Sequence, residues 1–361
     1  MPAPRNAVVG ILAAALIAGA MAVAQAQTQA PFQLNPVPTP PAPKAAPKPA
    51  ARKPAPPPAQ AKPAAPPTQA AAAPVAAGRG VDPAYGAYQR GHYLTAFQLA
   101  TQRVEEKSDP KSMALLGELY ANGFGVARDD KKAAEWYRLA ADRGDREAMF
   151  ALAMFHLGGR AGAVDREQAA KLLAAAAKLG HVAASYDLAL LYLEGNLFPQ
   201  DFARAAELFR FAAQAGNPEA QYALATLYKE GRGVPKDVNE TVRWLAAATA
   251  GDNTDAAVEY AIALFNGTGV ARDEAAAAAL LKKTARKGNA VAQNRLANIL
   301  AVGRGIRPDP VEAIKWHIVA KAGGVSDIPL DEFAQKQKPD VRAAAEKAAQ
   351  PWLEAIKASR S

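Results

Sequence analysis

Apolar and small residues recur at helical spacing through most of the chain, in pairs of segments joined by a short glycine-containing turn. The first segment of one such pair carries Leu116 and Tyr120 four residues apart and reaches Asn122. The second segment carries Trp136 and Ala140, again four residues apart. This spacing places the apolar side chains on one side of each helix, so the pattern predicts amphipathic helices that pack in pairs.

This pair of helices recurs six times at an interval of 36 residues. A glycine is predicted to end the first helix of each copy, and these are Gly123, Gly159, Gly195, Gly231, Gly267 and Gly303. An aspartate is predicted to cap the second helix, and these are Asp129, Asp165, Asp201, Asp237, Asp273 and Asp309. Small first-helix positions and large second-helix positions also recur, as interdigitating helices require: Gly117, Ala153, Ala189, Ala225, Ala261 and Ala297 against Trp136, Leu172, Leu208, Trp244, Leu280 and Trp316.

From residue 116 to residue 144 the first copy reads Leu-Gly-x-x-Tyr-x-x-Gly-x-Gly-Val-x-x-Asp-x-x-Lys-Ala-x-x-Trp-Tyr-x-x-Ala-Ala-x-x-Gly. This motif resembles the Sel1-like repeat, a relative of the tetratricopeptide repeat. The resemblance covers residues 108–324 and implies an all-α fold, an α-solenoid of six 36-residue helix-turn-helix repeats with terminal capping helices. Copies two and three depart from the motif, because Ala161-Gly162 and Leu197-Phe198 replace the Gly-Val pair of the turn.

Atypical segments flank the repeats, as the ends of a solenoid require. Residues 81–107 are predicted to cover the first copy with one amphipathic helix over Tyr85–Val104, with or without a short helix before it. At the other end, residues 325–361 are predicted to hold a connector, Val325–Lys338, and a capping helix, Pro339–Ala358.

The first 80 residues differ in composition from the rest. Residues 1–26 have a basic start, an apolar stretch and small residues at positions suited to cleavage, which predicts a secretory signal peptide, either cleaved or retained as an anchor. Residues 27–80 are predicted to be a disordered linker, since residues 31–74 hold 16 of the 28 prolines. No Asp or Glu precedes Asp82, so seven basic residues give this leader +7 of the net charge of +9. The nearly neutral repeats therefore do not predict a nucleic-acid-binding protein.

Reactive groups give little support for an enzyme. The chain has no cysteine, which excludes disulfides and thiolate metal sites. Ser108 and Lys111 match the Ser-x-x-Lys spacing of penicillin-recognising enzymes, but Pro110 makes this segment a helix start, and the partner motifs of those enzymes are missing. The four histidines, His92, His156, His181 and His317, lack metal-ligand spacing. We predict no catalytic, cofactor-binding or metal-binding residues, and no cofactor.

The resemblance implies that the first helix of each repeat lines a concave groove. Carried over from the tetratricopeptide pattern, three rows of lining residues are predicted for copies two to five. They are Phe150, Tyr186 and Tyr222; Met154, Leu190, Thr226 and Ile262; and Leu157, Leu193, Lys229 and Phe265.

These rows predict a non-enzymatic interaction scaffold that binds a partner protein or peptide, in the periplasm or outside a bacterial cell. Two alternatives stay open. One is a hydrolase or β-lactam-binding protein, as cysteine-rich relatives of the repeat suggest. The other is a peptidoglycan-associated structural protein held by its basic leader, whose residues 44–62 would contact envelope polymers or a membrane surface through weak electrostatic attraction.

Overall fold

The computed structural model describes residues 82–160 and 162–360, and every regular element among them is a helix. The predicted signal peptide and linker lie outside the described residues. The sixteen described helices are α2 (Pro83–Gln89), α3 (Tyr93–Lys107), α4 (Pro110–Asn122), α5 (Asp130–Ala141), α6 (Arg146–Leu157), α7 (Arg166–Lys178), α8 (Val182–Glu194), α9 (Phe202–Gln214), α10 (Pro218–Glu230), α11 (Val238–Ala250), α12 (Thr254–Asn266), α13 (Glu274–Arg286), α14 (Ala290–Val302), α15 (Pro310–Ala322), α16 (Ile328–Gln335) and α17 (Pro339–Ala358).

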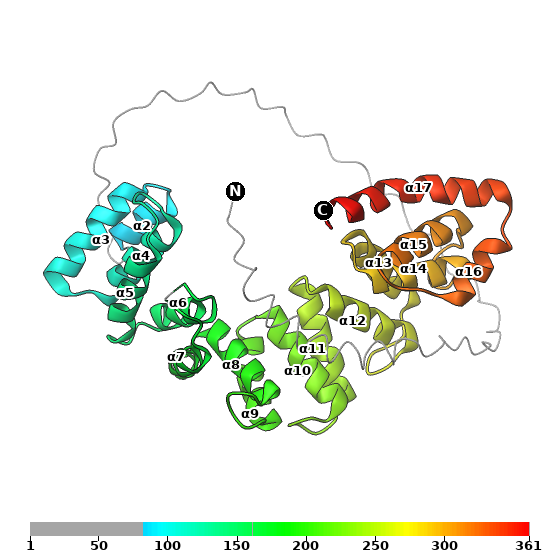
Figure 1. Ribbon diagram of the computed structural model, residues 1–361. Helices are drawn as coiled ribbons and strands as arrows, with labels where there is room; N and C mark the ends of the chain where they lie inside the picture. The colour runs from blue at the N-terminus through cyan, green and yellow to red at the C-terminus, as the bar shows by residue number, and fades with distance from the viewer. Residues whose placement is uncertain (1–81, 161, 361) are drawn as a thin grey trace, which may run out of the picture.

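The helices follow one another along an arc, with α2 and α3 at one end and α17 at the other (Figure 1). From α2 to α15, each helix packs against the helices before and after it in the chain. Helices α4 and α5 form the first of six such pairs, and α14 and α15 form the last. The predicted all-α solenoid of six helix-turn-helix repeats is confirmed.

Each second helix begins at the aspartate that the 36-residue period singles out. The side chain of Asp129 accepts a hydrogen bond from the Lys132 backbone N–H at 3.0 Å, and the other five loop aspartates cap their helices in the same way. A carboxylate here satisfies a backbone donor that has no partner within the helix, and it faces the positive end of the helix dipole.

Glycines in the turns allow neighbouring repeats to approach closely. Gly233 and Gly305 both have φ near +70°, and a Cβ atom on either would come within 2.1 Å of a backbone oxygen in the preceding repeat. Copy three has Leu197 in place of this glycine, and Leu197 and the next residue, Phe198, pack against the core, where Phe198 stacks on Tyr192. Copy two also departs, because α6 ends at Leu157, one residue earlier than the corresponding helices.

Packing between the two helices of a repeat depends on the small first-helix position. At Gly117 an added Cβ atom would lie 2.7 Å from the Tyr137 ring. The five alanines at this position in the other repeats have no solvent exposure. Any larger side chain would separate the helices, so the small-against-large pattern of the sequence corresponds to direct contact.

Helices outside the six repeats cap both ends of the solenoid, and only the N-terminal end differs from the sequence prediction. The single helix expected over Tyr85–Val104 is wrong, because the chain breaks between α2 and α3 at Gly91, where φ is +78°. The predicted C-terminal helix is confirmed as α17, and Trp352 on it packs against the buried Trp316 of the last repeat at 4.9 Å between ring centroids. The connector before it contains a further short helix, α16.

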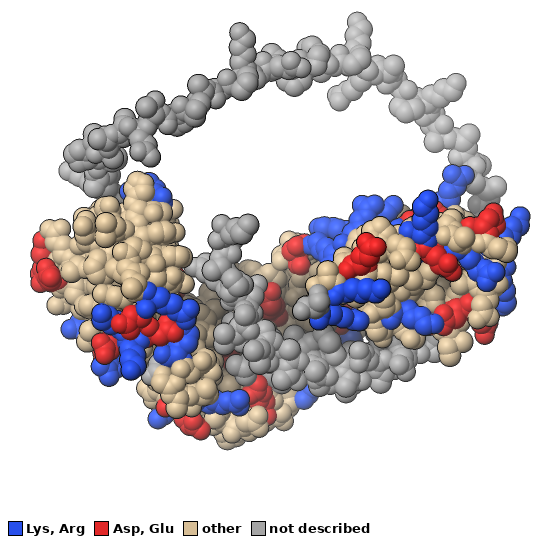
Figure 2. Space-filling model, turned by 45° about the horizontal axis from the view of Figure 1, so that its top comes forward, with Lys and Arg blue, Asp and Glu red and all other residues tan. Residues whose placement is uncertain are grey.

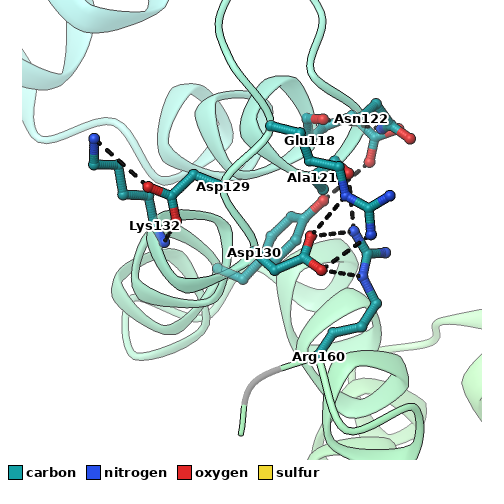
Figure 3. Close-up of polar contacts among 9 residues, drawn as sticks. Glu118, Ala121, Asn122, Asp129, Asp130, Lys132 and Arg160 are labelled. Carbon is teal, nitrogen blue, oxygen red and sulfur yellow. Dashed lines mark hydrogen bonds and ion pairs between the residues drawn. The ribbon is translucent and has the colours of Figure 1, made fainter.

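An ion-pair cluster joins the first repeat to the second (Figure 3). The Arg160 guanidinium, from the turn after α6, donates to both carboxylate oxygens of Asp130 and to the Ala121 carbonyl oxygen. Arg128 donates to the same carboxylate, and these donors hold the pKa of Asp130 well below its usual value. Arg304 bonds Glu274 at the equivalent positions four repeats on, so the same ion pair also joins the fifth repeat to the sixth.

Candidate binding surface

The first helices of the repeats, α4, α6, α8, α10, α12 and α14, present one side chain row after another along the solenoid. We call the solvent-facing side of these helices the first-helix face. In Figure 1, α6 and α8 lie nearer the hollow of the arc than their partners α7 and α9. Side chains link neighbouring first helices directly: the Tyr222 hydroxyl on α10 donates to Glu259 on α12 at 2.9 Å. The face is therefore a surface continuous from one repeat to the next.

Eight of the eleven predicted groove residues reach solvent on this side of the molecule. They are Phe150, Met154, Leu157, Leu193, Tyr222, Thr226 and Ile262, which are partly exposed, and Lys229, which is exposed. The other three, Tyr186, Leu190 and Phe265, are only 7%, 7% and 3% exposed. Tyr186 packs on Phe209, and the guanidinium of Arg304 lies over the Phe265 ring. These three side chains therefore support the face from within and do not form its outer surface.

Charged groups on the face are mostly paired. Glu259 accepts hydrogen bonds from the Tyr222 hydroxyl and from the Lys229 ammonium group, both at 2.9 Å. Burial, followed by the nearby Glu259 charge, raises the pKa of Tyr222, so this hydroxyl keeps its proton and remains a donor. The aromatic ring and the ion pair thus hold α10 and α12 in a fixed relation.

Asp187 is an acidic residue of the face that sequence reasoning missed. It lies on α8, partly exposed, and makes no hydrogen bond or ion pair with any described residue. Burial raises the pKa of its carboxyl group to about 7. The signal was present in the sequence, because the residues at the same register are Leu115, Ala151, Asp187, Ala223, Glu259 and Arg295.

Polar side chains border the face at its two ends. On α14, the side chains of Asn294 and Asn298 both donate to Asp327. At the other end, Glu118 on α4 accepts hydrogen bonds from the hydroxyls of Tyr88 and Tyr137. The partly exposed apolar residues of the face lie in the repeats between these polar ends.

The segment with the Ser-x-x-Lys spacing has an evident structural role. Ser108 ends α3 in a left-handed conformation, Asp109 caps α4, and Pro110 is the first residue of that helix. The side chains of Ser108 and Lys111 are both exposed and share no hydrogen bond. This is the predicted helix start.

Two histidines have clear packing roles. His181 caps α8 through its Nδ1 atom, stacks on Phe150 and contacts the Glu147 carboxylate at 3.1 Å. His317, 3% exposed, contacts Asp331 at 2.8 Å beside an open hollow of about 400 Å³ between α15, α16 and α17. Among residues 82–160 and 162–360, no group of three or more His, Asp or Glu side chains is arranged to hold a metal ion.

Comparison with known proteins agrees with this architecture. Six consecutive matches to the Sel1 repeat cover residues 110–145, 146–181, 182–217, 218–253, 254–289 and 290–325. The chain belongs to the Sel1 repeat family. Each matched unit begins at a first helix and ends after a second helix, as the helices α4 to α15 do. The start and end of the repeats predicted from the sequence differ from these matches by two residues or fewer.

Two solved structures of similar proteins support the same fold. A protective antigen present in uropathogenic Escherichia coli strains, described as displaying an SLR fold, is 26% identical; the alignment covers 76% of this chain and 68% of that chain, with a TM-score of 0.55. A Sel1 repeat protein from Oxalobacter formigenes is 25% identical; 66% of this chain and 94% of that chain are covered, with a TM-score of 0.56. No curated protein sequence gives a significant match.

Membership in this family has consequences for function at a coarse level. Sel1 repeat solenoids, like the related tetratricopeptide repeats, generally mediate interactions between proteins and are generally non-catalytic. None of the described helices is both long and apolar enough to span a membrane.

Proposed function

We propose that this chain is a non-enzymatic scaffold of the bacterial envelope that binds a segment of a partner protein along the first-helix face. The contact residues are the eight solvent-reaching residues named above, centred on Phe150, Met154, Tyr222 and Ile262. The observation that carries the proposal is the partly exposed aromatic and aliphatic surface that runs over four consecutive repeats between polar ends. An extended or helical segment buries apolar side chains against such a surface while its polar groups stay at the rim.

Site-specific photo-crosslinking tests this assignment in intact cells. A photoreactive phenylalanine analogue replaces Met154 or Ile262 on the first-helix face, or Phe211 on α9 as a matched control. Phe211 is apolar and 43% exposed, but it lies on a second helix. We expect the same partner adducts from the first two positions and none from the third. Adducts that form only at Phe211 would contradict the proposal, provided that circular dichroism shows all three variants to be folded.

Substitution gives a complementary test of the same face. Met154→Glu and Ile262→Glu place charges on partly exposed positions, so both variants should fold, and both should lose the crosslinked partner. The buried Leu190 and Phe265 are unsuitable for this purpose, because a charge there disrupts the core. Variants that fold and retain every adduct would place partner binding elsewhere.

Export to the envelope is supported by the composition of residues 1–26 and by the similarity to a protective antigen present in uropathogenic Escherichia coli strains. A secretory signal peptide predicts that the purified mature protein begins near residue 27. Amino-terminal sequencing of the protein from a periplasmic extract measures this directly. A mature protein that keeps its first residues and remains in the cytoplasmic fraction would refute the envelope assignment.

A further inference from the structure

The repeats provide an internal comparison for Asp187. Two repeats further along the chain, Glu259 occupies the same register and is held by Tyr222 and Lys229 of the preceding repeat. The residues at the equivalent positions two repeats earlier, 72 residues before these two donors, are Phe150 and Leu157. At the positions that supply a hydroxyl and an ammonium group to Glu259, the chain therefore offers Asp187 a phenyl ring and an aliphatic side chain.

The replacement leaves a carboxylate in surroundings that disfavour its charge. Phe150 and Leu157 belong to the apolar packing around the core between α6 and α8. Burial raises the pKa of Asp187 to about 7. Burial also raises the pKa of Asp255 on α12, but Asp255 accepts a hydrogen bond from Asn289 that opposes the rise, whereas no described residue donates to Asp187. The neighbouring positions in the same row are alanines, Ala151 and Ala223, which contribute no donor.

Charge is also divided between the two helices of the repeats. The six first helices, α4 to α14, carry eight acidic and four basic residues, whereas the six second helices, α5 to α15, carry seven acidic and fourteen basic residues. Figure 2 shows many Lys and Arg side chains, interspersed with Asp and Glu, over the C-terminal end of the solenoid. The first-helix face is thus the side of the molecule that attracts a cationic ligand.

We propose that Asp187 receives the ammonium or guanidinium group of a lysine or arginine in the partner segment, in the way that Glu259 receives Lys229. This inference rests on the proposed function and names the chemistry of its partner: an otherwise apolar segment with a basic side chain. The ion pair fixes the register of the segment on the face, because only one repeat has an unpaired carboxylate at this position.

A peptide array measures the preference for a cation. The full chain is applied to nonapeptides in which the fifth residue is Lys, Arg, norleucine or Glu and the other eight are randomised among uncharged residues. We expect Lys and Arg peptides to bind at least about tenfold better than norleucine peptides. In Asp187→Asn we expect the two kinds of peptide to bind equally well. Glu207→Gln removes an exposed acidic residue of α9 and should leave the preference unchanged.

Three array results would overturn the inference. If peptides bind but show no preference for Lys or Arg, or if Asp187→Asn keeps the preference, the cation site is refuted while the proposed scaffold function stands. If neutralising the basic residues 44–62 of the leader raises peptide affinity, the occupant is the chain's own leader and no partner is required. If no peptide binds at all, the proposed function fails on the array, and the following measurement still decides the cation site.

An engineered cation provides that measurement without any peptide. Leu157→Lys places an ammonium group where Lys229 stands relative to Glu259, whereas Leu193→Lys places one opposite Ala223, which has no carboxylate. Carbon-13 NMR of the Asp187 carboxyl group should show its pKa falling by at least about one unit in Leu157→Lys and staying constant in Leu193→Lys. An Asp187 pKa that is the same in both variants would refute the cation site, because a cation at the position equivalent to Lys229 would then leave the carboxylate unaffected.

Discussion

Removing the charge of Asp187 should stabilise the protein at neutral pH. Asp187→Asn keeps the size of the side chain and replaces a carboxyl group that burial disfavours when ionised. The pKa is about 7 in the folded protein against an ordinary value of 3.8. A difference of roughly three units corresponds to about 4 kcal/mol in the free energy of unfolding. The side chain is partly exposed, so solvent screening reduces this figure, and we expect a gain of about 1–3 kcal/mol at pH 8.

The pH dependence identifies the cause. A folded-state pKa above the unfolded value means that the native protein binds this proton more tightly than the unfolded chain does. Below about pH 4 the carboxyl group is protonated in both states, so it does not lower the free energy of unfolding. Its destabilising effect grows as the pH rises from about 4 to about 7 and is complete above that window. The difference between Asp187→Asn and the unmodified chain should therefore rise from near zero at pH 4 to its full value at pH 8.

Urea unfolding followed by circular dichroism between pH 4 and pH 8 measures this difference. Other carboxylates with lowered pKa values, such as those of Asp130 and Asp331, titrate in both proteins and cancel in the comparison. Glu207→Gln, on the exposed side of α9, should change the free energy of unfolding by less than about 0.5 kcal/mol at every pH. A flat difference curve, or an Asp187→Asn protein that is less stable at pH 8, would refute the burial argument.

Three further predictions concern the solenoid itself. Arg160→Met removes the donors that join the first two repeats and should lower the free energy of unfolding by about 1–2 kcal/mol, measured in urea at pH 7. Gly305→Ala should cost at least about 2 kcal/mol more than Gly288→Ala, because both glycines have positive φ but only the first would bring a Cβ atom against backbone; thermal unfolding of the two variants compares them. Trp352→Ala uncovers Trp316 and should cost about 2–4 kcal/mol, with a red shift of the tryptophan fluorescence. Equal costs for the two glycines, or an unshifted spectrum, would contradict the packing described above.

The repeat architecture could be predicted from the sequence because its signals are local and recur. An aspartate that caps a helix and a glycine that ends one depend only on the residues within a single turn. Because these signals recur every 36 residues, each copy supports the assignment of the others. The break at Gly91 was missed for the opposite reason. It occurs outside the repeats, where no second copy indicates that an apparently continuous apolar pattern is interrupted.

The exposure of individual groove residues could not be predicted in the same way. A repeat pattern assigns one role to all copies, but solvent access depends on which side chain of the next element lies above. Phe265 is buried because Arg304, 39 residues later, covers its ring, and Tyr186 is buried because it packs on Phe209. Phe150, at the register of Tyr186, stays partly exposed although His181 stacks on it. Such contacts join residues from different copies, so no single copy reveals them.

Asp187 affects stability and, by our proposal, also partner binding. Ala151 and Ala223 occupy the same register in the neighbouring repeats, so the scaffold accepts an alanine there and packing does not require a carboxylate. A residue that costs stability and contributes nothing to packing is expected where binding needs it. If the solenoid served only as a spacer, Asp187→Ala would raise its stability and would not weaken any partner binding. If the partner adducts formed at Met154 weaken in this more stable variant, the carboxylate serves binding; if they persist unchanged, the cost of Asp187 has no functional counterpart on this face.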